Sequence, residues 1–271
     1  MKKYGKGINS KNFWNKEADE YTSVLKNDYH THRLSILKKI IPADLYKKGK
    51  NILDFGCGDA VIFPDFLKKG ANIKGIDISS EIIEIGKQSL KKAGYDPSII
   101  SCNDVSYLKK IPSASLDAVM SYNVLAYLST EEDLEFYKQV SRILKKGGYL
   151  IVSHSNELFD MYTFNKYTVE FFNTHFIQES SYKNKIKELM KNSNVPENLV
   201  TYNVRENPLC YKFKLAAFKL KEDSQEFSHY HDAPPVLLKK KVYKDTLKVK
   251  ESDKWKLMFQ CSTYFSRSVK V

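Results

Sequence analysis

The sequence predicts an α/β fold whose sheet is mostly parallel and covered by helices on both faces. Short apolar segments alternate with amphipathic ones from residue 51 to residue 153. The apolar segments are continuous rather than alternating, which is typical of strands buried on both faces. The first strand runs directly into the turn Gly56-Cys57-Gly58, and the second ends in Asp77. This arrangement predicts a ligand cleft at the carboxyl ends of parallel strands.

The chain is predicted to begin with helix. Residues 11–41 carry apolar side chains at helical spacing, and Pro42 ends this segment. The residues that share a face are Phe13, Trp14, Ala18, Tyr21 and Leu25.

The alternating region follows. One helix is expected over about 59–69, with its regular part beginning at Pro64, and a second is expected from Ser79 or Ser80 to about Gly94. Ser129 and Glu132 have the spacing of a capping box, which opens a third helix that ends near residues 145–148. Five strands are expected at 51–55, 72–76, 99–101, 116–121 and 149–153.

The alternation stops after His154. Aromatic residues three or four apart predict a helical insertion after strand five, where it would cover the cleft. A short helix is expected after Asn207-Pro208. Strands follow at 227–231 and 257–265, with helix or loop between at 239–250. We therefore predict a single domain over 1–271, made of a cofactor-binding core (11–155), a helical insertion or cap (156–206) and C-terminal strands that complete the sheet (207–271).

Composition narrows the classes of partner. The net charge is +12, but only four of the 44 basic residues are arginines and the lysines are spread along the chain. Proteins that read bases and phosphates usually rely on arginine forks, so most of this charge is interpreted as solvated surface. Four scattered cysteines, a polar N-terminus and the absence of a membrane-length apolar run predict a cytoplasmic protein.

The glycine turn carries the first chemical signal. Gly56 and Gly58 lack side chains, so the backbone turns sharply and approaches a ligand closely. The helix predicted after the turn directs free N–H groups at that ligand. Asp77 is expected to accept hydrogen bonds from both ribose hydroxyls of an adenosine group. Its alternative role is to cap the following helix.

A dinucleotide site is the main competing interpretation. Its G-x-G-x-x-G fingerprint needs a third glycine where this chain has Val61. Asp54 lies directly before the turn, where it would repel a diphosphate but attract the ammonium group of a methionyl chain. These residues favour S-adenosyl-L-methionine over NAD.

The motif at residues 52–58 resembles the cofactor site of class I S-adenosylmethionine-dependent methyltransferases. In that family an apolar-apolar-acidic-apolar-Gly-x-Gly segment opens the site, and the common third glycine is Ala60 here. The resemblance implies a Rossmann-like fold with a seven-stranded sheet. It places Asp77 at the ribose, Ile78 beside the adenine, Asp104 with Val105 at the adenine amine, and residues 121–125 at the methyl-transfer site.

Aromatic residues are candidates for the rest of the cofactor cavity, because their faces attract a sulfonium cation. Each of Trp14, Tyr21, Tyr122 and Tyr127 taken singly also suits ordinary core packing. The predicted cofactor contacts are Trp14, Tyr21, Asp54, Gly56, Cys57, Gly58, Asp77, Ile78, Asp104, Val105, Tyr122 and Asn123.

Transfer of a methyl group to a hydroxyl needs a base, and histidine suits this at neutral pH. His154 follows strand five at the edge where the pocket is expected, and His229 and His231 alternate on one strand. A structural role is an equal alternative for each of the three. Asp232 would point away from His231 on a strand, so no metal site is predicted.

Three short motifs resemble the tail of bacterial methyltransferases associated with surface polysaccharide or other sugar modification: Asn207-Pro208-Leu209, residues 227–231 and Ala233-Pro234-Pro235. The resemblance implies a small-molecule acceptor, a hydroxyl of a sugar or sugar nucleotide. Two alternatives stay open. The first is an RNA methyltransferase, although the Asn/Asp-Pro-Pro-aromatic motif of base-amino methyltransferases is absent from 121–124. The second is a non-catalytic protein that binds the cofactor.

Overall fold

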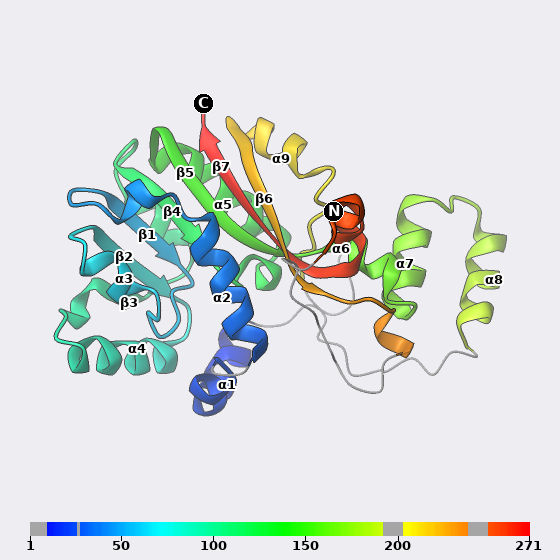
Figure 1. Ribbon diagram of the computed structural model, residues 1–271, viewed down its shortest axis with the longest axis horizontal. Helices are drawn as coiled ribbons and strands as arrows, with labels where there is room; N and C mark the ends of the chain where they lie inside the picture. The colour runs from blue at the N-terminus through cyan, green and yellow to red at the C-terminus, as the bar shows by residue number, and fades with distance from the viewer. Residues whose placement is uncertain (1–9, 26–27, 192–202, 238–248) are drawn as a thin grey trace.

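The computed structural model describes residues 10–25, 28–191, 203–237 and 249–271. Their strands form one seven-stranded sheet in the order β3-β2-β1-β4-β5-β7-β6 (Figure 1). All neighbouring strands are parallel except β7, which is antiparallel to both β5 and β6. The strands are β1 (Asn51–Phe55), β2 (Asn72–Asp77), β3 (Ile100–Cys102), β4 (Leu116–Ser121), β5 (Leu144–Ser155), β6 (Leu220–Tyr230) and β7 (Cys261–Lys270).

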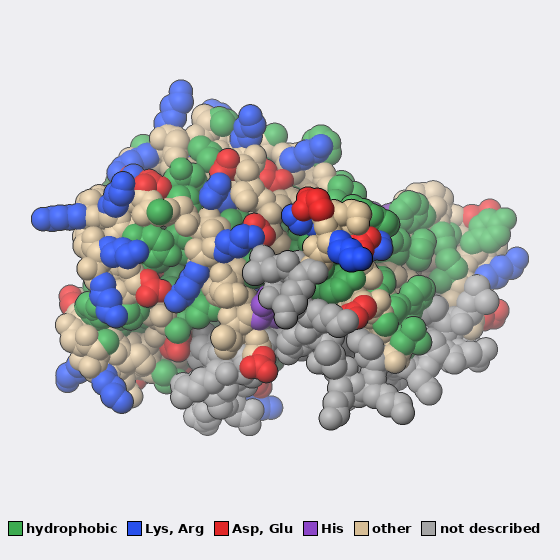
Figure 2. All heavy atoms as spheres, in the orientation of Figure 1, with side chains coloured by type: hydrophobic (Ala, Val, Ile, Leu, Met, Phe, Trp, Pro, Cys, Tyr) green, Lys and Arg blue, Asp and Glu red, His purple; other side chains and the backbone are tan. Residues whose placement is uncertain are grey.

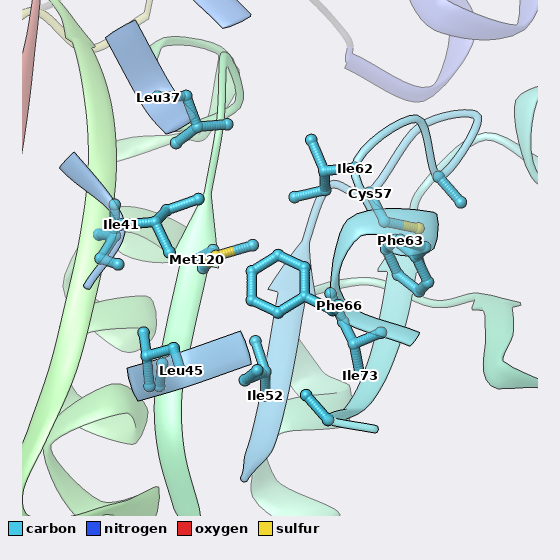
Figure 3. Packing of buried hydrophobic residues seen from close by; sticks show 14 of the residues in the cluster. Leu37, Ile41, Leu45, Ile52, Cys57, Ile62, Phe63, Phe66, Ile73 and Met120 are labelled. Carbon is cyan, nitrogen blue, oxygen red and sulfur yellow. The ribbon is translucent and has the colours of Figure 1, made fainter. Parts of the chain in front are cut away.

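Helices cover both faces of the sheet. One face is covered by α2, α3 and α4, whose apolar side chains pack against alternate residues of the strands, such as Ile52 and Met120 (Figure 3). The other face is covered by α5 and α9, which pack against Leu53, Phe55 and Val119. The helices are α1 (Ser10–Leu25), α2 (Asp28–Ile40), α3 (Phe63–Leu67), α4 (Ser80–Lys92), α5 (Thr130–Ile143), α6 (Glu157–Tyr162), α7 (Lys166–His175), α8 (Ser180–Lys191), α9 (Tyr211–Ala217) and α10 (Leu257–Gln260).

The helices begin where their sequences predict a cap. Ser79 accepts a hydrogen bond from the backbone N–H of Ile82 at the start of α4. At α5, Ser129 and Glu132 form the predicted capping box, each side chain bonding the backbone of the other residue. Helix α4 thereby starts three residues after Asp77, the last residue of β2 at the carboxyl edge of the sheet.

The structure differs from the sequence prediction at several boundaries. The predicted helix over 11–41 consists of two helices, α1 and α2. Strand β5 extends to both sides of the predicted 149–153. In the C-terminal part, β6 begins at Leu220, and residues 257–260 form α10 before the last strand. The stretch 239–250 lies almost entirely outside the described residues. The extension of β5 to Ser155 and the long β6 follow from their pairing with β7, which residue type alone does not indicate.

The predicted helical insertion consists of α6, α7 and α8. Figure 1 shows α7 and α8 projecting from one end of the molecule, beyond the C-terminal strands. Helix α8 packs against α7, and α7 against α6. Within the described residues, no helix combines the length and the apolar character that crossing a membrane requires.

Lysine side chains are scattered over the surface. Figure 2 shows them spread across the visible face of the sheet domain, interspersed with acidic groups rather than gathered in one patch. Several are paired, as in the contacts of Lys38 with Asp65 and of Lys39 with Glu226. Exposed pairs of this kind contribute little to stability, about 0–1 kcal/mol each.

Candidate functional site

A cavity of about 300 Å³ lies at the carboxyl ends of β1, β2 and β4. Its wall contains ten of the twelve residues that the sequence predicts as cofactor contacts. Gly58 is bonded to one of them, and the side chain of Tyr21 is outside the described part of the chain. The ten residues are Trp14, Asp54, Gly56, Cys57, Asp77, Ile78, Asp104, Val105, Tyr122 and Asn123.

The glycine turn is hydrogen-bonded to the neighbouring strand, β2. The N–H groups of Gly56 and Cys57 both donate to the carbonyl of Ile76, at 2.7 and 3.0 Å. Gly56 has a φ of 78°, and a Cβ at this position would lie 2.0 Å from Cγ2 of Val124. Only glycine suits both the dihedral angle and the space, so this turn keeps its backbone exposed to the cavity.

The helix after the turn is shorter than predicted. Helix α3 has five residues and begins at Phe63, next to Pro64, where the sequence predicts the regular part of the helix, but the predicted start from about residue 59 is not helical. Ala60, at the position of the family's third glycine, has a φ of 60°, which is left-handed backbone. This conformation is incompatible with continuous α-helix from Asp59. The expected contribution of a helix N-terminus to ligand binding is therefore small here.

Asp77 ties the turn to the start of α4. Its Oδ2 accepts from the N–H of Gly58 at 3.1 Å, and its Oδ1 accepts from the N–H of Ser79 at 2.9 Å. Each carboxylate oxygen has a second lone pair, so both remain able to accept a ribose hydroxyl. Burial raises the pKa of Asp77, and the N–H groups of Ser79, Gly58 and Ile78 oppose that rise. The two roles predicted for Asp77 are thus compatible.

Asp54 is a buried carboxyl group with capacity to bind a cation. It is 4% exposed, and its Oδ1 has no hydrogen-bond partner among the described residues. Burial, with a smaller contribution from the charge of Asp77, raises the pKa of Asp54 to about 8. An ammonium group placed beside it would reverse both effects. This observation fits the methionyl amine of the predicted cofactor.

The far end of the cavity is formed by the segment after β3. Asp104 caps the turn there, and its Oδ1 accepts from the backbone N–H and the hydroxyl of Ser106 at 2.8 and 2.6 Å. These bonds, the hydroxyl first, lower the pKa of Asp104. Ile78 and Val105 provide apolar surface on either side. An ionised acceptor between two apolar groups fits an adenine ring with its amine.

Two nitrogen-bearing side chains of the wall were missed by the sequence prediction. His30 and Arg33 lie one turn apart on α2, and both line the cavity. The guanidinium of Arg33 is buried and lies 5.4 Å from the centre of the Tyr122 ring. Arginine is scarce in this chain, so a single one within the first helical segment was an available signal. A carboxylate such as that of a methionyl group fits opposite a buried guanidinium.

The outer wall of the cavity is aromatic. Tyr127 contacts both Trp14 and Phe13 of α1, with ring centres 5.1 and 6.1 Å apart. Tyr122 stacks on Phe265 of β7. The predicted aromatic lining therefore comes from the first helix and from the segment after β4. The described residues of the insertion, 156–191 and 203–206, contribute nothing to the wall, in contrast to its predicted role as a cover for the cleft.

The structure places His154 away from the cavity, although the sequence predicts it at the pocket edge. His154 lies within β5 and is 3% exposed, between the rings of Tyr211 and Tyr264 at 4.6 and 4.9 Å. Side chains alternate along a strand, so His154 shares the face of Leu150 and Val152, which pack against α5 and α9. Burial, and to a lesser extent Lys214, holds its pKa well below the usual range.

The C-terminal histidines are also absent from the cavity wall. His229 is fully buried with a φ of 61°, and its ring lies 5.5 Å from that of His32. His231 packs on Phe159 of α6 at 5.2 Å. The two rings therefore contact different helices, α2 and α6, rather than meeting at one site as the prediction of a shared face requires. Among the described residues, no group of three His, Cys, Asp or Glu side chains is arranged to hold a metal.

The central part of the chain matches a known family. Residues 53–152 fit the family model described as a methyltransferase domain. These residues of the chain form a methyltransferase domain. This domain spans β1 to β5, so it contains the glycine turn, Asp77 and Asp104. The predicted fold class is confirmed.

The sequence relatives match about half of the chain, whereas the solved structures match nearly all of it in fold. The ubiquinone biosynthesis O-methyltransferase of Coxiella burnetii (strain Dugway 5J108-111) is 26% identical over 126 residues, which is 46% of this chain and 52% of that protein. The chain thus spans about half the length of the curated relatives it matches.

Two solved structures share the fold. Magnesium protoporphyrin IX methyltransferase from Synechocystis PCC 6803, solved with bound S-adenosylhomocysteine, is 12% identical with a TM-score of 0.59, covering 96% of this chain and 98% of that one. A methyltransferase from Archaeoglobus fulgidus is 17% identical with a TM-score of 0.53, covering 92% and 100%. Identities this low establish the fold alone.

Proposed function

We propose that the chain is an S-adenosylmethionine-dependent methyltransferase that methylates a hydroxyl group of a small molecule. The observation that carries the proposal is the charge pattern of the cavity. A buried carboxyl at Asp54 lies at one end of the turn, Arg33 lies in the same wall, and Asp77 and Asp104 follow along the carboxyl edge. This order matches the ammonium, carboxylate, ribose and adenine of one ligand.

The residues of the chain would bind and orient both reactants. The cofactor, when bound, supplies a methyl group on a positively charged sulfur. Asp54 and Arg33 would hold its amino-acid end, while the two oxygens of Asp77 would fix the ribose. Alignment of the acceptor with that methyl group is the main source of rate acceleration, worth up to about 7–11 kcal/mol.

The acceptor enters beside the aromatic wall. Trp14, Tyr122 and Tyr127 offer flat apolar faces there, and such faces pack against a sugar ring or a phenol ring. We propose a hydroxyl of a sugar or sugar nucleotide as the acceptor, as the C-terminal motifs suggest. A phenol is the second candidate, because several matching relatives are named for O-methylation in ubiquinone biosynthesis.

The test is transfer of a labelled methyl group from S-adenosylmethionine to a panel of acceptors. The panel contains sugar nucleotides, oligosaccharides, phenols and RNA. Label on a sugar or phenol hydroxyl supports the proposal and decides between the two acceptors. Label on RNA alone supports the RNA methyltransferase alternative. Tight S-adenosylhomocysteine binding without transfer to any acceptor supports the non-catalytic alternative.

The predicted cytoplasmic location stays a prediction. Two parts of the site prediction are carried into the proposal, the cofactor contacts in the cavity wall and the aromatic lining. The three histidines of the prediction are not, because each lies outside the wall that the described residues form.

A further inference from the structure

We propose that His30 accepts the proton that the acceptor hydroxyl loses during methyl transfer. This inference rests on the proposed function, since it assigns a catalytic residue to O-methylation in the same cavity. All six histidines of the chain are among the described residues, and His30 is the one that lines the cavity. The position on α2, rather than on a strand end, explains why the sequence did not indicate it.

The placement of His30 suits a residue that meets the acceptor. His30 and Arg33 are three residues apart, so they share one face of α2, and that face forms the cavity wall. Arg33 lies over the ring of Tyr122, which directly follows β4. His30 is therefore on the part of the wall that faces the end of β4, the place where the family resemblance locates methyl transfer.

The methyl-transfer step needs one proton acceptor, and His30 can take this role. A lone pair of the acceptor oxygen forms the new O–C bond, while the C–S bond breaks and its electron pair stays on sulfur. The hydroxyl proton passes to an imidazole nitrogen of His30. Without a base, the oxygen would carry both the methyl group and the proton as a strongly acidic oxonium. A weak base is therefore sufficient if it lies within hydrogen-bond distance of the hydroxyl.

The protonation state of His30 agrees with this role. Burial, followed by the charge of Arg33, lowers the pKa of His30 to about 4. The imidazole is then neutral at pH 7 and has a nitrogen that accepts a proton. The charged and titratable groups that share the cavity wall with His30 include Glu17 of α1, Arg33 of α2, Asp54 of β1 and Tyr122 after β4. Along the rest of α2, His32 contacts His229, Lys39 pairs with Glu226 of β6, and Arg267 of β7 donates to the carbonyl of Ile40.

The decisive experiment varies the acidity of the acceptor. His30→Gln and the control His32→Gln, on the same helix but outside the cavity wall, are assayed with acceptors whose hydroxyl pKa ranges from alcohol to strongly acidic phenol. For weakly acidic hydroxyls, His30→Gln is expected to lower kcat about 10²–10⁴-fold. For phenols already ionised at the assay pH, the loss should shrink to less than about threefold, because no proton remains to be transferred.

Two further measurements, cofactor-product affinity and the pH dependence of kcat/KM, separate a catalytic role of His30 from a binding role. S-adenosylhomocysteine affinity of His30→Gln should stay within about threefold of the unmodified protein, which separates chemistry from cofactor binding. The kcat/KM of the unmodified protein should fall as pH decreases toward about 4, and His30→Gln should lack this limb. An equal loss of kcat for acidic and weakly acidic acceptors, or unchanged kcat, would overturn the assignment of His30. Absence of transfer by the unmodified protein would instead overturn the proposed function.

Discussion

Gly56 faces Val124 so closely that a Cβ on the glycine would lie 2.0 Å from the valine Cγ2. The glycine belongs to the turn after β1, and the valine follows β4, so this contact joins two strand ends at the floor of the cavity. It also explains why a side chain is excluded at the first glycine of the motif, independently of any ligand.

Gly56→Ala is expected to lose most cofactor affinity and part of its stability, because the new methyl group collides with Val124 in a left-handed backbone. Gly94→Ala is the matched control, since Gly94 has a φ of 80° but nothing within 4 Å of its Cβ position. The control should lose about 1 kcal/mol of stability through its backbone angle and keep its affinity. Calorimetry with S-adenosylhomocysteine and thermal melting measure both. Equal affinity losses in the two variants would show that the clash is not the cause.

Asp54→Asn is expected to gain stability relative to the unmodified protein as pH rises. The folded pKa of Asp54, about 8, lies above its ordinary value of 3.8. The favourable contribution of the protonated group is therefore complete below about pH 4 and is lost as pH rises through about 8. Asparagine cannot ionise. The free energy of unfolding of the variant should therefore increase relative to that of the unmodified protein between pH 5 and pH 8. Each unit of pKa corresponds to about 1.4 kcal/mol, so an effect of several kcal/mol is the upper limit.

Urea unfolding at the two pH values measures this difference. Asp117→Asn is the control, because interactions with Asn51 and Lys145 lower the pKa of Asp117 despite its partial burial. Asp117 is thus ionised at both pH values, and its replacement should give a difference that is constant between them. A constant difference for Asp54→Asn as well would contradict the raised pKa.

Arg33→Met is expected to weaken binding of S-adenosylhomocysteine about 10–100-fold, because one charge-assisted contact to the amino-acid carboxylate is lost. Binding of methylthioadenosine, which lacks the amino-acid part, should change less than about threefold. Calorimetry with the two ligands separates the carboxylate contact from a general disturbance of the cavity. Equal losses for both ligands would argue against a specific role of Arg33, and Arg33→Lys should recover part of the affinity through its charge.

Asp77→Ala is expected to weaken both of these ligands, by about 10–100-fold, because the ribose is common to them. The variant should also lose some stability, since the N–H groups of Gly58 and Ser79 lose their acceptor. Calorimetry at a temperature well below the melting point of the variant measures the affinity of folded protein. Unchanged affinity for methylthioadenosine would remove the ribose assignment and leave Asp77 as a cap of the turn alone.

The sequence by itself determined the sheet core and the cofactor edge. Continuous apolar strands, the glycine turn and the acidic strand ends are local patterns, and the parallel connections bring them to one edge of the sheet. Nine of the ten predicted contacts in the cavity wall meet there for this reason, and the tenth, Trp14, comes from α1. The capping box at Ser129 could also be predicted from the sequence, because its two partners lie within one turn of helix.

Only the tertiary structure decided which histidine meets the cavity. His154 was placed by its position after an apolar strand, but β5 continues past it and the alternation of side chains turns it toward α9. His30 enters the wall because α2 packs across β6 and β7. Such a contact between segments about 200 residues apart leaves no periodic signal in the chain, since it depends on how separate elements pack rather than on the residues within either one.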